Sequence, residues 1–167
     1  MPTELQISDY IESTSWTIGV ISDTHGLLRP EVLKSFEGVD LILHAGDVGD
    51  PEVIDLLESV APLVVVRGNM DYGSWADRLP VSTSLVIDKI KLFLIHDIER
   101  VDAKMKLQNY QVVITGHTHC PLIEKQDNIL FINPGSAGPQ RNRHSVSIGK
   151  LTFFDGQLDA QLVELDV

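Results

Sequence analysis

Six apolar segments of this 167-residue chain end in the same way, and that repetition limits the folds open to it. Each is a nearly continuous run of valine, isoleucine and leucine that passes into glycine, aspartate, asparagine or histidine. Apolar runs of this kind are typical of strands buried on both faces. The six predicted strands occupy residues 17–25, 40–48, 62–71, 91–97, 110–119 and 129–136.

Two amphipathic segments between the first three strands predict helices. Residues 29–38 have a proline near their start and a glycine at their end, the usual asymmetry of helix boundaries. Residues 50–60 begin with Asp50 as a candidate N-cap and carry an apolar stripe. A weaker helical pattern covers residues 97–110. The order strand–helix–strand–helix–strand predicts a mainly parallel central sheet with helices outside.

The last part of the chain predicts two further strands joined at Asp155–Gly156, which is a strong hairpin signal. We expect these strands to form a second sheet packed on the first. Residues 16–167 are expected to form one domain. Residues 1–15 are an N-terminal extension, expected to be a tail or a short helix.

The composition excludes several classes of function. A formal net charge of −11 opposes binding to long nucleic acids. No apolar run approaches the ~20 residues of a membrane span, and the acidic N-terminus does not resemble a signal peptide. We therefore expect a cytoplasmic protein without a membrane partner. Cys120 is the one cysteine, so no internal disulfide can form. The sequence leaves open whether the chain forms a homodimer or a higher homo-oligomer.

The polar residues that follow the strands are expected to meet, because the carboxyl ends of strands in open α/β sheets form one edge. Carboxylate, imidazole and amide groups are ligands for ions such as Mn²⁺, Fe²⁺, Ni²⁺ and Zn²⁺. Taken singly, each short motif is also compatible with an ordinary cap or turn. Together they predict a metal site. The converging set is Asp23, His25, Asp47, Asn69, Asp71, His96, His117, His119, Asn133 and Ser136.

The order of these motifs resembles the calcineurin-like metallophosphoesterase superfamily: DTH at 23–25, GDV at 46–48, GNMD at 68–71, a histidine at 96 and GHTH at 116–119. The short chain, GNMD, and INPGSAGPQR at 132–141 resemble its small single-domain bacterial and archaeal phosphodiesterases. The resemblance runs from about Trp16 to the C-terminus. It implies an α/β fold of two packed mixed β-sheets flanked by helices.

The resemblance also implies a dinuclear centre whose bound hydroxide hydrolyses small phosphodiesters. The ions would be Mn²⁺ by preference, with Ni²⁺, Fe²⁺, Zn²⁺ and Mg²⁺ as alternatives. One ion would be held by Asp23, His25, Asp47 and His119, and the other by Asp47, Asn69, His96 and His117. Asp47, Asn69 and His117 would also take catalytic roles.

Two positions depart from the family pattern. Met70 stands where many members carry a histidine that protonates the leaving group, which favours diesters with acidic leaving groups. Asp97 and Ile98 stand where close relatives read Gly-His after the fourth-motif histidine. We expect Asp97 to cap the following helix. The alternative is that its charge projects into the site, where it would bind a metal or repel phosphate.

Two other functions remain open on the sequence. A non-catalytic or weakly active scaffold of the same fold, like the retromer subunit of this superfamily, would be expected to have lost its metal histidines. A phosphomonoesterase is disfavoured by Met70. Among the remaining polar residues, His44 is expected to pack within its strand, Asp71 to be structural, and Arg141 and His144 to lie at the surface.

Overall fold

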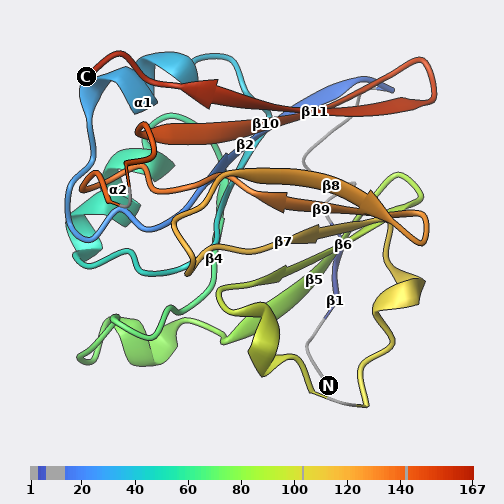
Figure 1. The fold of residues 1–167 in the computed structure, drawn as a ribbon, viewed down its shortest axis with the longest axis horizontal. Coiled ribbons are helices and arrows are strands. Elements are labelled where there is room, and N and C mark those ends of the chain that lie inside the picture. Colours follow the sequence, from blue (N-terminus) through green and yellow to red (C-terminus); the bar gives the residue numbers. More distant parts are fainter. Residues whose placement is uncertain (1–3, 7–13, 103, 142) are drawn as a thin grey trace.

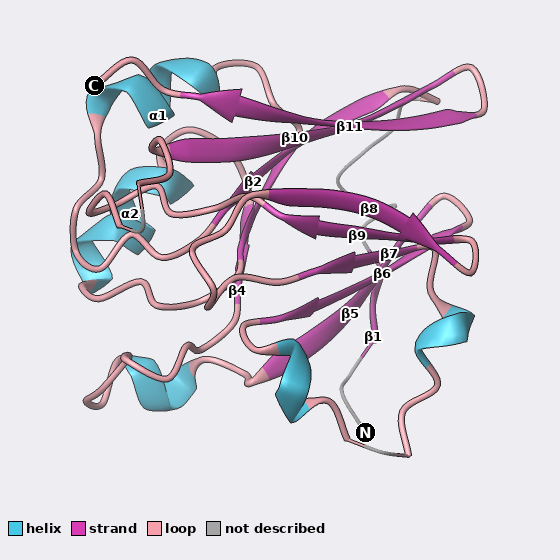
Figure 2. Ribbon diagram, in the orientation of Figure 1, coloured by secondary structure: helices cyan, strands magenta, loops and turns pink. Residues whose placement is uncertain are grey.

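Two β-sheets pack face to face in the computed structural model, which describes residues 4–6, 14–102, 104–141 and 143–167 (Figures 1 and 2). The first sheet has the order β11-β10-β2-β3-β4 and the second β1-β5-β6-β7-β9-β8. Both mix parallel and antiparallel pairs, which confirms the predicted fold class. The first sheet comprises β2 (Trp16–Ile21), β3 (Leu41–His44), β4 (Leu63–Val65), β10 (Ser147–Phe154) and β11 (Gln157–Glu164). The second comprises β1 (Glu4–Gln6), β5 (Ser82–Ile87), β6 (Ile90–Ile95), β7 (Val112–Ile114), β8 (Leu122–Gln126) and β9 (Ile129–Asn133).

The six predicted strands exist, but the prediction that they share one mainly parallel central sheet is wrong. Strands β2, β3 and β4 lie in the first sheet, whereas β6, β7 and β9 lie in the second. The C-terminal hairpin of β10 and β11 joins the first sheet, because β10 pairs with β2, and does not form the second sheet. Apolar runs show that a strand is buried, but they do not specify its neighbour.

Strands β5 and β8 were absent from the sequence prediction, and their composition explains why. Strand β5 begins with three hydroxyl residues, Ser82 to Ser84. Strand β8 is mostly exposed and carries Glu124, Lys125 and Gln126. Strand β5 has an apolar run of only three residues, at 85–87, and β8 has only Leu122 and Ile123.

The two stronger helix predictions are confirmed as α1 (Pro30–Ser35) and α2 (Pro51–Glu58). Asp50 caps α2, because its Oδ1 accepts the backbone N–H of Glu52 at 2.8 Å. The helix predicted over residues 97–110 is wrong: its described residues form two 3-10 turns, at Ile98–Arg100 and Leu107–Asn109. The first turn ends at Val101, whose backbone is extended (φ −62°, ψ 127°). A further 3-10 turn spans Ala76–Arg78.

Part of the N-terminal extension is a strand, where a tail or a short helix was expected. Residues Glu4–Gln6 form β1, which runs parallel to β5 at the edge of the second sheet. Residues 7–13 lie outside the described part of the chain, so the boundary proposed at residue 15 stays a prediction. None of the described helices is long and apolar enough to cross a membrane.

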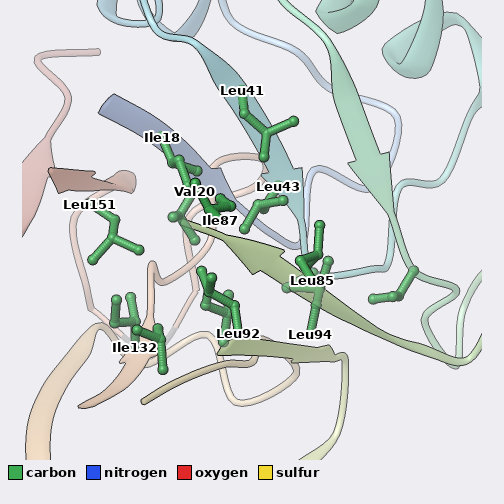
Figure 3. Packing of buried hydrophobic residues seen from close by; sticks show 14 of the residues in the cluster. Ile18, Val20, Leu41, Leu43, Leu85, Ile87, Leu92, Leu94, Ile132 and Leu151 are labelled. Carbon is green, nitrogen blue, oxygen red and sulfur yellow. The ribbon is translucent and has the colours of Figure 1, made fainter. Parts of the chain in front are cut away.

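The main core lies between the two sheets, and its side chains point toward one another in Figure 3. Ile18, Val20 and Leu43 come from the first sheet and meet Leu85, Leu92 and Leu94 from the second. A second core fills the space between the first sheet and the two helices, which lie at the left of Figure 1. The first sheet is therefore covered on both faces, as its continuous apolar runs predict.

Candidate metal centre

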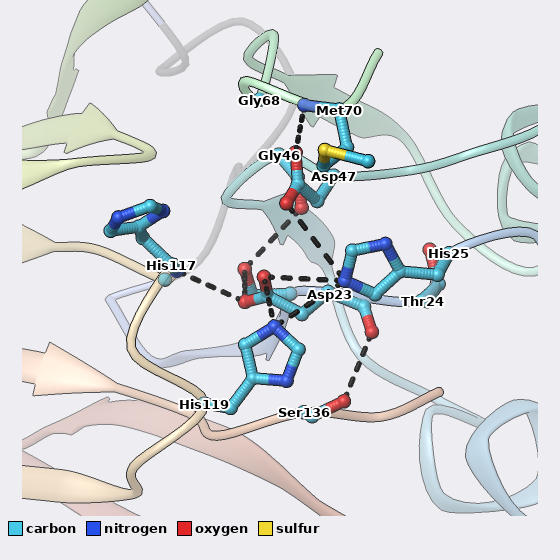
Figure 4. Close-up of polar contacts among 12 residues, drawn as sticks. Asp23, Thr24, His25, Gly46, Asp47, Gly68, Met70, His117, His119 and Ser136 are labelled. Atoms are coloured by element: carbon cyan, nitrogen blue, oxygen red, sulfur yellow. Dashed lines mark hydrogen bonds and ion pairs between the residues drawn. The ribbon is translucent and has the colours of Figure 1, made fainter. Parts of the chain in front are cut away.

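The carboxyl ends of strands from both sheets meet at one edge of the molecule, and the loops there carry all seven predicted ligands. Loops after β2, β3 and β4 bring residues from the first sheet, and loops after β6 and β7 bring residues from the second. Figure 4 shows Asp23, His25, Asp47 and His119 directed toward a common centre. The structure thus brings together side chains that are widely separated in the sequence.

The first group of donor atoms belongs to Asp23, His25 and His119. Nε2 of His119 lies 3.1 Å from Oδ1 of Asp23 and 3.3 Å from Nε2 of His25. Nε2 of His25 lies 3.8 Å from the same carboxylate oxygen. The three donor atoms lie within 4.8 Å of one another, a spacing that one cation could bridge.

The second group belongs to Asn69, His96 and His117. Oδ1 of Asn69 lies 3.0 Å from Nε2 of His96 and 3.1 Å from Nδ1 of His117. His117 is an exposed candidate ligand, with 42% of its side chain accessible to solvent. Two imidazole nitrogens and an amide oxygen therefore face one point beside the first group.

Asp47 lies between the two groups. Its Oδ2 is 3.8 Å from Nε2 of His25 and 3.3 Å from Nε2 of His96. Its other oxygen, Oδ1, accepts the backbone N–H of Met70 at 2.8 Å, which fixes the orientation of the carboxylate. One side chain can thus serve both groups, as a bridging ligand must.

The tautomer of His96 leaves one nitrogen available to a cation. Nδ1 lies 2.7 Å from the carbonyl oxygen of Ala45, which can only accept, so Nδ1 carries the proton. In the neutral ring Nε2 then holds the free electron pair, and this is the atom that faces Asn69 and Asp47.

The backbone of the site is strained. Ten non-glycine residues in the described part of the chain have a positive φ, and five of them are candidate ligands. A side chain in this left-handed region costs on the order of 1–3 kcal/mol, and such strain gathers at functional sites. The five, with φ between 46° and 69°, are Asp23, His25, Asp47, His117 and His119.

Two glycines allow the loops to approach the carboxylates closely. A Cβ on Gly68 would overlap the backbone nitrogen and Oδ1 of Asp47. A Cβ on Gly116 would overlap Oγ of Ser22 and lie 2.8 Å from Oδ2 of Asp23. Any side chain at either position would displace a candidate ligand.

Buried polar residues hold these loops in place, and Asp71 is structural, as expected. Its two oxygens accept the backbone N–H groups of Gly49 at 2.9 Å and Gly68 at 2.8 Å. Asn133 donates to the carbonyl of Gly116 at 2.8 Å, and Ser136 donates to the carbonyl of Asp23 at 3.1 Å. The loops after β2, β3, β4 and β7 are therefore fixed by side chains outside the ligand set.

Ser22 and the carbonyl of Ala45 take part in the site, although the sequence reasoning did not single them out. Ser22 is fully buried, and its hydroxyl donates to Oδ2 of Asp23 at 2.6 Å. A serine directly before the motif aspartate was the available signal. No signal in the sequence could have indicated the carbonyl of Ala45, because its orientation depends on the fold.

Three titratable groups of the site have shifted pKa values. Burial lowers the pKa of His25 below its ordinary value, with Asp47 and Asp23 acting in the opposite direction. Burial also acts to raise the pKa of Asp47, but hydrogen bonds from His96 and from the Met70 N–H outweigh it and lower that pKa. For His96, burial is outweighed by the same hydrogen bond and by nearby carboxylates, so its pKa is raised. A cation binding at Nε2 would displace this proton.

His44 packs within its strand, as expected, and lies behind the site. Its Nδ1 accepts the backbone N–H of Gly46 at 3.1 Å, and Nε2 lies 3.0 Å from Oγ1 of Thr24. Complete burial lowers its pKa to about 4. A neutral His44 therefore links the loops after β2 and β3. Three residues that were not expected to be ligands, Cys120, Arg141 and His144, are exposed.

Asp97 caps the segment that follows it, as expected, and its other carboxylate oxygen faces a candidate ligand. Its Oδ1 accepts the backbone N–H of Glu99 at 3.0 Å, which caps the 3-10 turn that follows. Its Oδ2 lies 3.8 Å from Nε2 of His117. The carboxylate thus caps a turn and also places negative charge beside a candidate ligand.

The donor set fits divalent cations. Oδ1 of Asp23 is buried and accepts no hydrogen bond from the described residues, yet it faces the Nε2 atoms of two histidines. An unpaired buried carboxylate oxygen is costly, and a cation would satisfy it. Nitrogen and oxygen donors without thiolate suit Mn²⁺, Fe²⁺, Ni²⁺ or Zn²⁺.

Comparisons with known proteins agree with this geometry. The model of the calcineurin-like phosphoesterase superfamily domain matches residues 17–155. A probable metallophosphoesterase of Methanocaldococcus jannaschii is 39% identical over 170 residues, covering 94% of this chain and 85% of that protein. A phosphodiesterase of Escherichia coli is 30% identical over 156 residues, covering 78% of this chain and 84% of that protein.

Solved structures share the fold. The structure of an archaeal phosphodiesterase superposes with a TM-score of 0.73 at 28% identity, covering 88% of this chain and 99% of that one. Vacuolar Protein Sorting 29 from Cryptosporidium parvum superposes with a TM-score of 0.72 at 16% identity, covering 93% of this chain and 100% of that one, a likeness of fold alone. Because the family model matches most of the chain and a relative is 39% identical to it, the chain belongs to the calcineurin-like phosphoesterase superfamily.

Proposed function

We propose that this protein is a metal-dependent phosphodiesterase that hydrolyses small phosphodiesters with two divalent cations, Mn²⁺ by preference. The observation that carries the proposal is the position of Asp47. Its Oδ2 faces a histidine of each donor group, His25 on one side and His96 on the other. A shared carboxylate between two sets of nitrogen and oxygen donors is the arrangement a dinuclear site requires.

Some residues of the site would bind the cations, and others hold those ligands in position. Asp23, His25 and His119 would hold one cation, and Asn69, His96 and His117 the other, with Asp47 between them. When bound, such cations lower the pKa of a water molecule toward neutrality and offset the charge on phosphoryl oxygens. His117 is partly exposed, so a substrate can reach the site from its side. Ala45 and Met70 hold His96 and Asp47 in position through backbone groups.

Diesters are the proposed substrates because the site offers no general acid at the third motif. Met70 is 51% exposed and cannot donate a proton to a leaving group. Leaving groups that are stable anions need no such proton. The names of two relatives support the same class, since proteins of Escherichia coli and Methanocaldococcus jannaschii at 30% and 32% identity are phosphodiesterases.

The test is hydrolysis of bis-p-nitrophenyl phosphate and p-nitrophenyl phosphate by metal-stripped protein titrated with Mn²⁺, Ni²⁺, Mg²⁺ or Zn²⁺. We expect metal-dependent cleavage of the diester at least about tenfold faster than that of the monoester. Asp47→Ala and His117→Ala should lower the diester rate by about 10² or more. His144→Ala, which removes an exposed histidine outside the site, should leave it unchanged.

The two alternative functions, a scaffold and a phosphomonoesterase, would give different results in this experiment. A scaffold would bind metal and turn over neither ester with any ion. A phosphomonoesterase would prefer p-nitrophenyl phosphate. The presence of all seven donor side chains in one site supports the enzyme over the scaffold, and Met70 supports the diester over the monoester.

A further inference from the structure

A cavity of about 320 Å³ opens beside the candidate metal centre. Its lining includes Arg67, Asn69, Tyr72, Val81, His96 and Arg100. Asn69 and His96 belong to the second donor group, so the cavity adjoins that half of the site. We propose that it binds a nucleobase, so that the natural substrate is a phosphodiester carrying a nucleoside. This inference rests on the proposed function and names the substrate class.

The cavity exposes apolar surface next to charged groups. Tyr72 is 66% exposed and Val81 is 62% exposed, although both are large apolar side chains. Met70 and Ile98, also exposed, neighbour Asn69 and Asp97 in the segments that line the cavity. Clustered exposed apolar side chains mark binding surfaces. Tyrosine presents a flat ring on which a base can stack.

The two arginines favour a flat neutral ring over a second phosphate. Arg67 is held by the carbonyl of Asp71 at 3.1 Å and by the carboxylate of Asp77 at 3.0 Å. Nε of Arg100 lies 3.7 Å from Oδ2 of Asp97. A carboxylate lies beside each guanidinium and offsets part of the positive charge of the arginine. The planar face of the guanidinium remains suited to stacking on an aromatic ring.

The size and the charge of the molecule limit the ligand to a single nucleoside unit. About 320 Å³ lies at the lower end of the range for small-molecule sites. The net charge of −11 opposes a nucleic-acid polymer. A nucleoside held by its base would place its phosphate toward Asn69 and His96, where hydrolysis is proposed.

The inference is tested by calorimetric titration of the Mn²⁺-loaded protein with two probes, adenosine 5′-monophosphate and ribose 5-phosphate. Both carry the same phosphate on the same sugar, but only the first has a base. We expect the nucleotide to bind about tenfold more tightly, the contribution of one stacked base. Tyr72→Ala should remove most of that difference and Tyr72→Phe should keep it. Phe154→Ala, at a residue that is 72% exposed on β10, is the matched control.

Equal affinity for the two probes would overturn the nucleobase site, as would an unchanged difference in Tyr72→Ala. Hydrolysis of bis-p-nitrophenyl phosphate, measured on the same preparations, separates this result from a failure of the proposed function. A protein that prefers the nucleotide but hydrolyses no diester would retain the binding site and refute the phosphodiesterase.

Discussion

Nε2 of His117 lies 3.8 Å from Oδ2 of Asp97, while Nδ1 of the same ring lies 3.1 Å from Oδ1 of Asn69. One edge of the imidazole therefore faces the second donor group and the other faces a carboxylate. A carboxylate beside a ligating histidine helps to orient its ring. The departure from the family pattern at residue 97 thus gives this chain a support for His117 that glycine could not supply.

Replacing Asp97 by asparagine tests this support, because asparagine still caps the turn but removes the charge. We expect Asp97→Asn to weaken Mn²⁺ binding to the stripped protein by about tenfold, the usual effect of losing such a partner. Calorimetric titration measures the affinity. If the variant binds Mn²⁺ as tightly as the natural protein and hydrolyses diesters faster, Asp97 acts instead by repelling phosphate.

Acid should destabilise the metal-free protein through His44. Its pKa falls from 6.5 to about 4 on burial, so below pH 6.5 the unfolded chain binds a proton that the folded chain excludes. The stability is present above pH 6.5 and is lost as the pH falls toward 4, by roughly 3 kcal/mol in all. Urea unfolding at a series of pH values measures it.

His44→Gln is the matched control, since glutamine can both accept from Gly46 and donate to Thr24 without titrating. Between pH 6.5 and 4, this variant should lose about 3 kcal/mol less unfolding free energy than the natural protein does. An identical pH dependence in the two proteins would assign the acid sensitivity to other groups.

Adding a methyl group to Gly68 should abolish metal binding. The new Cβ in Gly68→Ala would overlap the backbone nitrogen and Oδ1 of Asp47, so this ligand must move. We expect a loss of about 3 kcal/mol in stability and no measurable Mn²⁺ binding by calorimetry. Gly38→Ala has open space around its Cβ and a φ of +79°, so it should cost about 1 kcal/mol and leave Mn²⁺ binding intact. Normal binding by Gly68→Ala would contradict the close packing described.

Divalent cations should stabilise the folded protein, because they satisfy the unpaired Oδ1 of Asp23. Mn²⁺ at 100 times its Kd should add about 2.7 kcal/mol to the unfolding free energy. The gain should shrink from pH 8 to pH 6, since the pKa of His96 is raised and a proton competes for Nε2. Thermal unfolding with Mn²⁺ or chelator measures the gain, and His119→Ala should reduce it. The same melting temperature with and without Mn²⁺ would count against the site.

The position of each candidate ligand could be predicted from the sequence. A strand buried on both faces must be apolar, so a polar residue at its end marks the edge of the sheet. This reasoning located Asp23, Asp47, Asn69, His96 and His117 at the ends of five strands, and the structure brings them together. The helix cap at Asp50 was equally local and was predicted correctly.

The tertiary structure alone decided how the strands are divided between two sheets. Residues 110–119 and 17–25 have the same apolar character, yet β7 and β2 lie in different sheets. The Asp97 cap on the Glu99 backbone N–H is a local contact, whereas the approach of the same side chain to His117 joins residues that are far apart in sequence. Hydrophobic pattern and capping act between residues near in sequence. Strand pairing, the approach of Asp97 to His117 and the cavity beside Tyr72 depend on contacts between distant segments, which only the folded chain brings together.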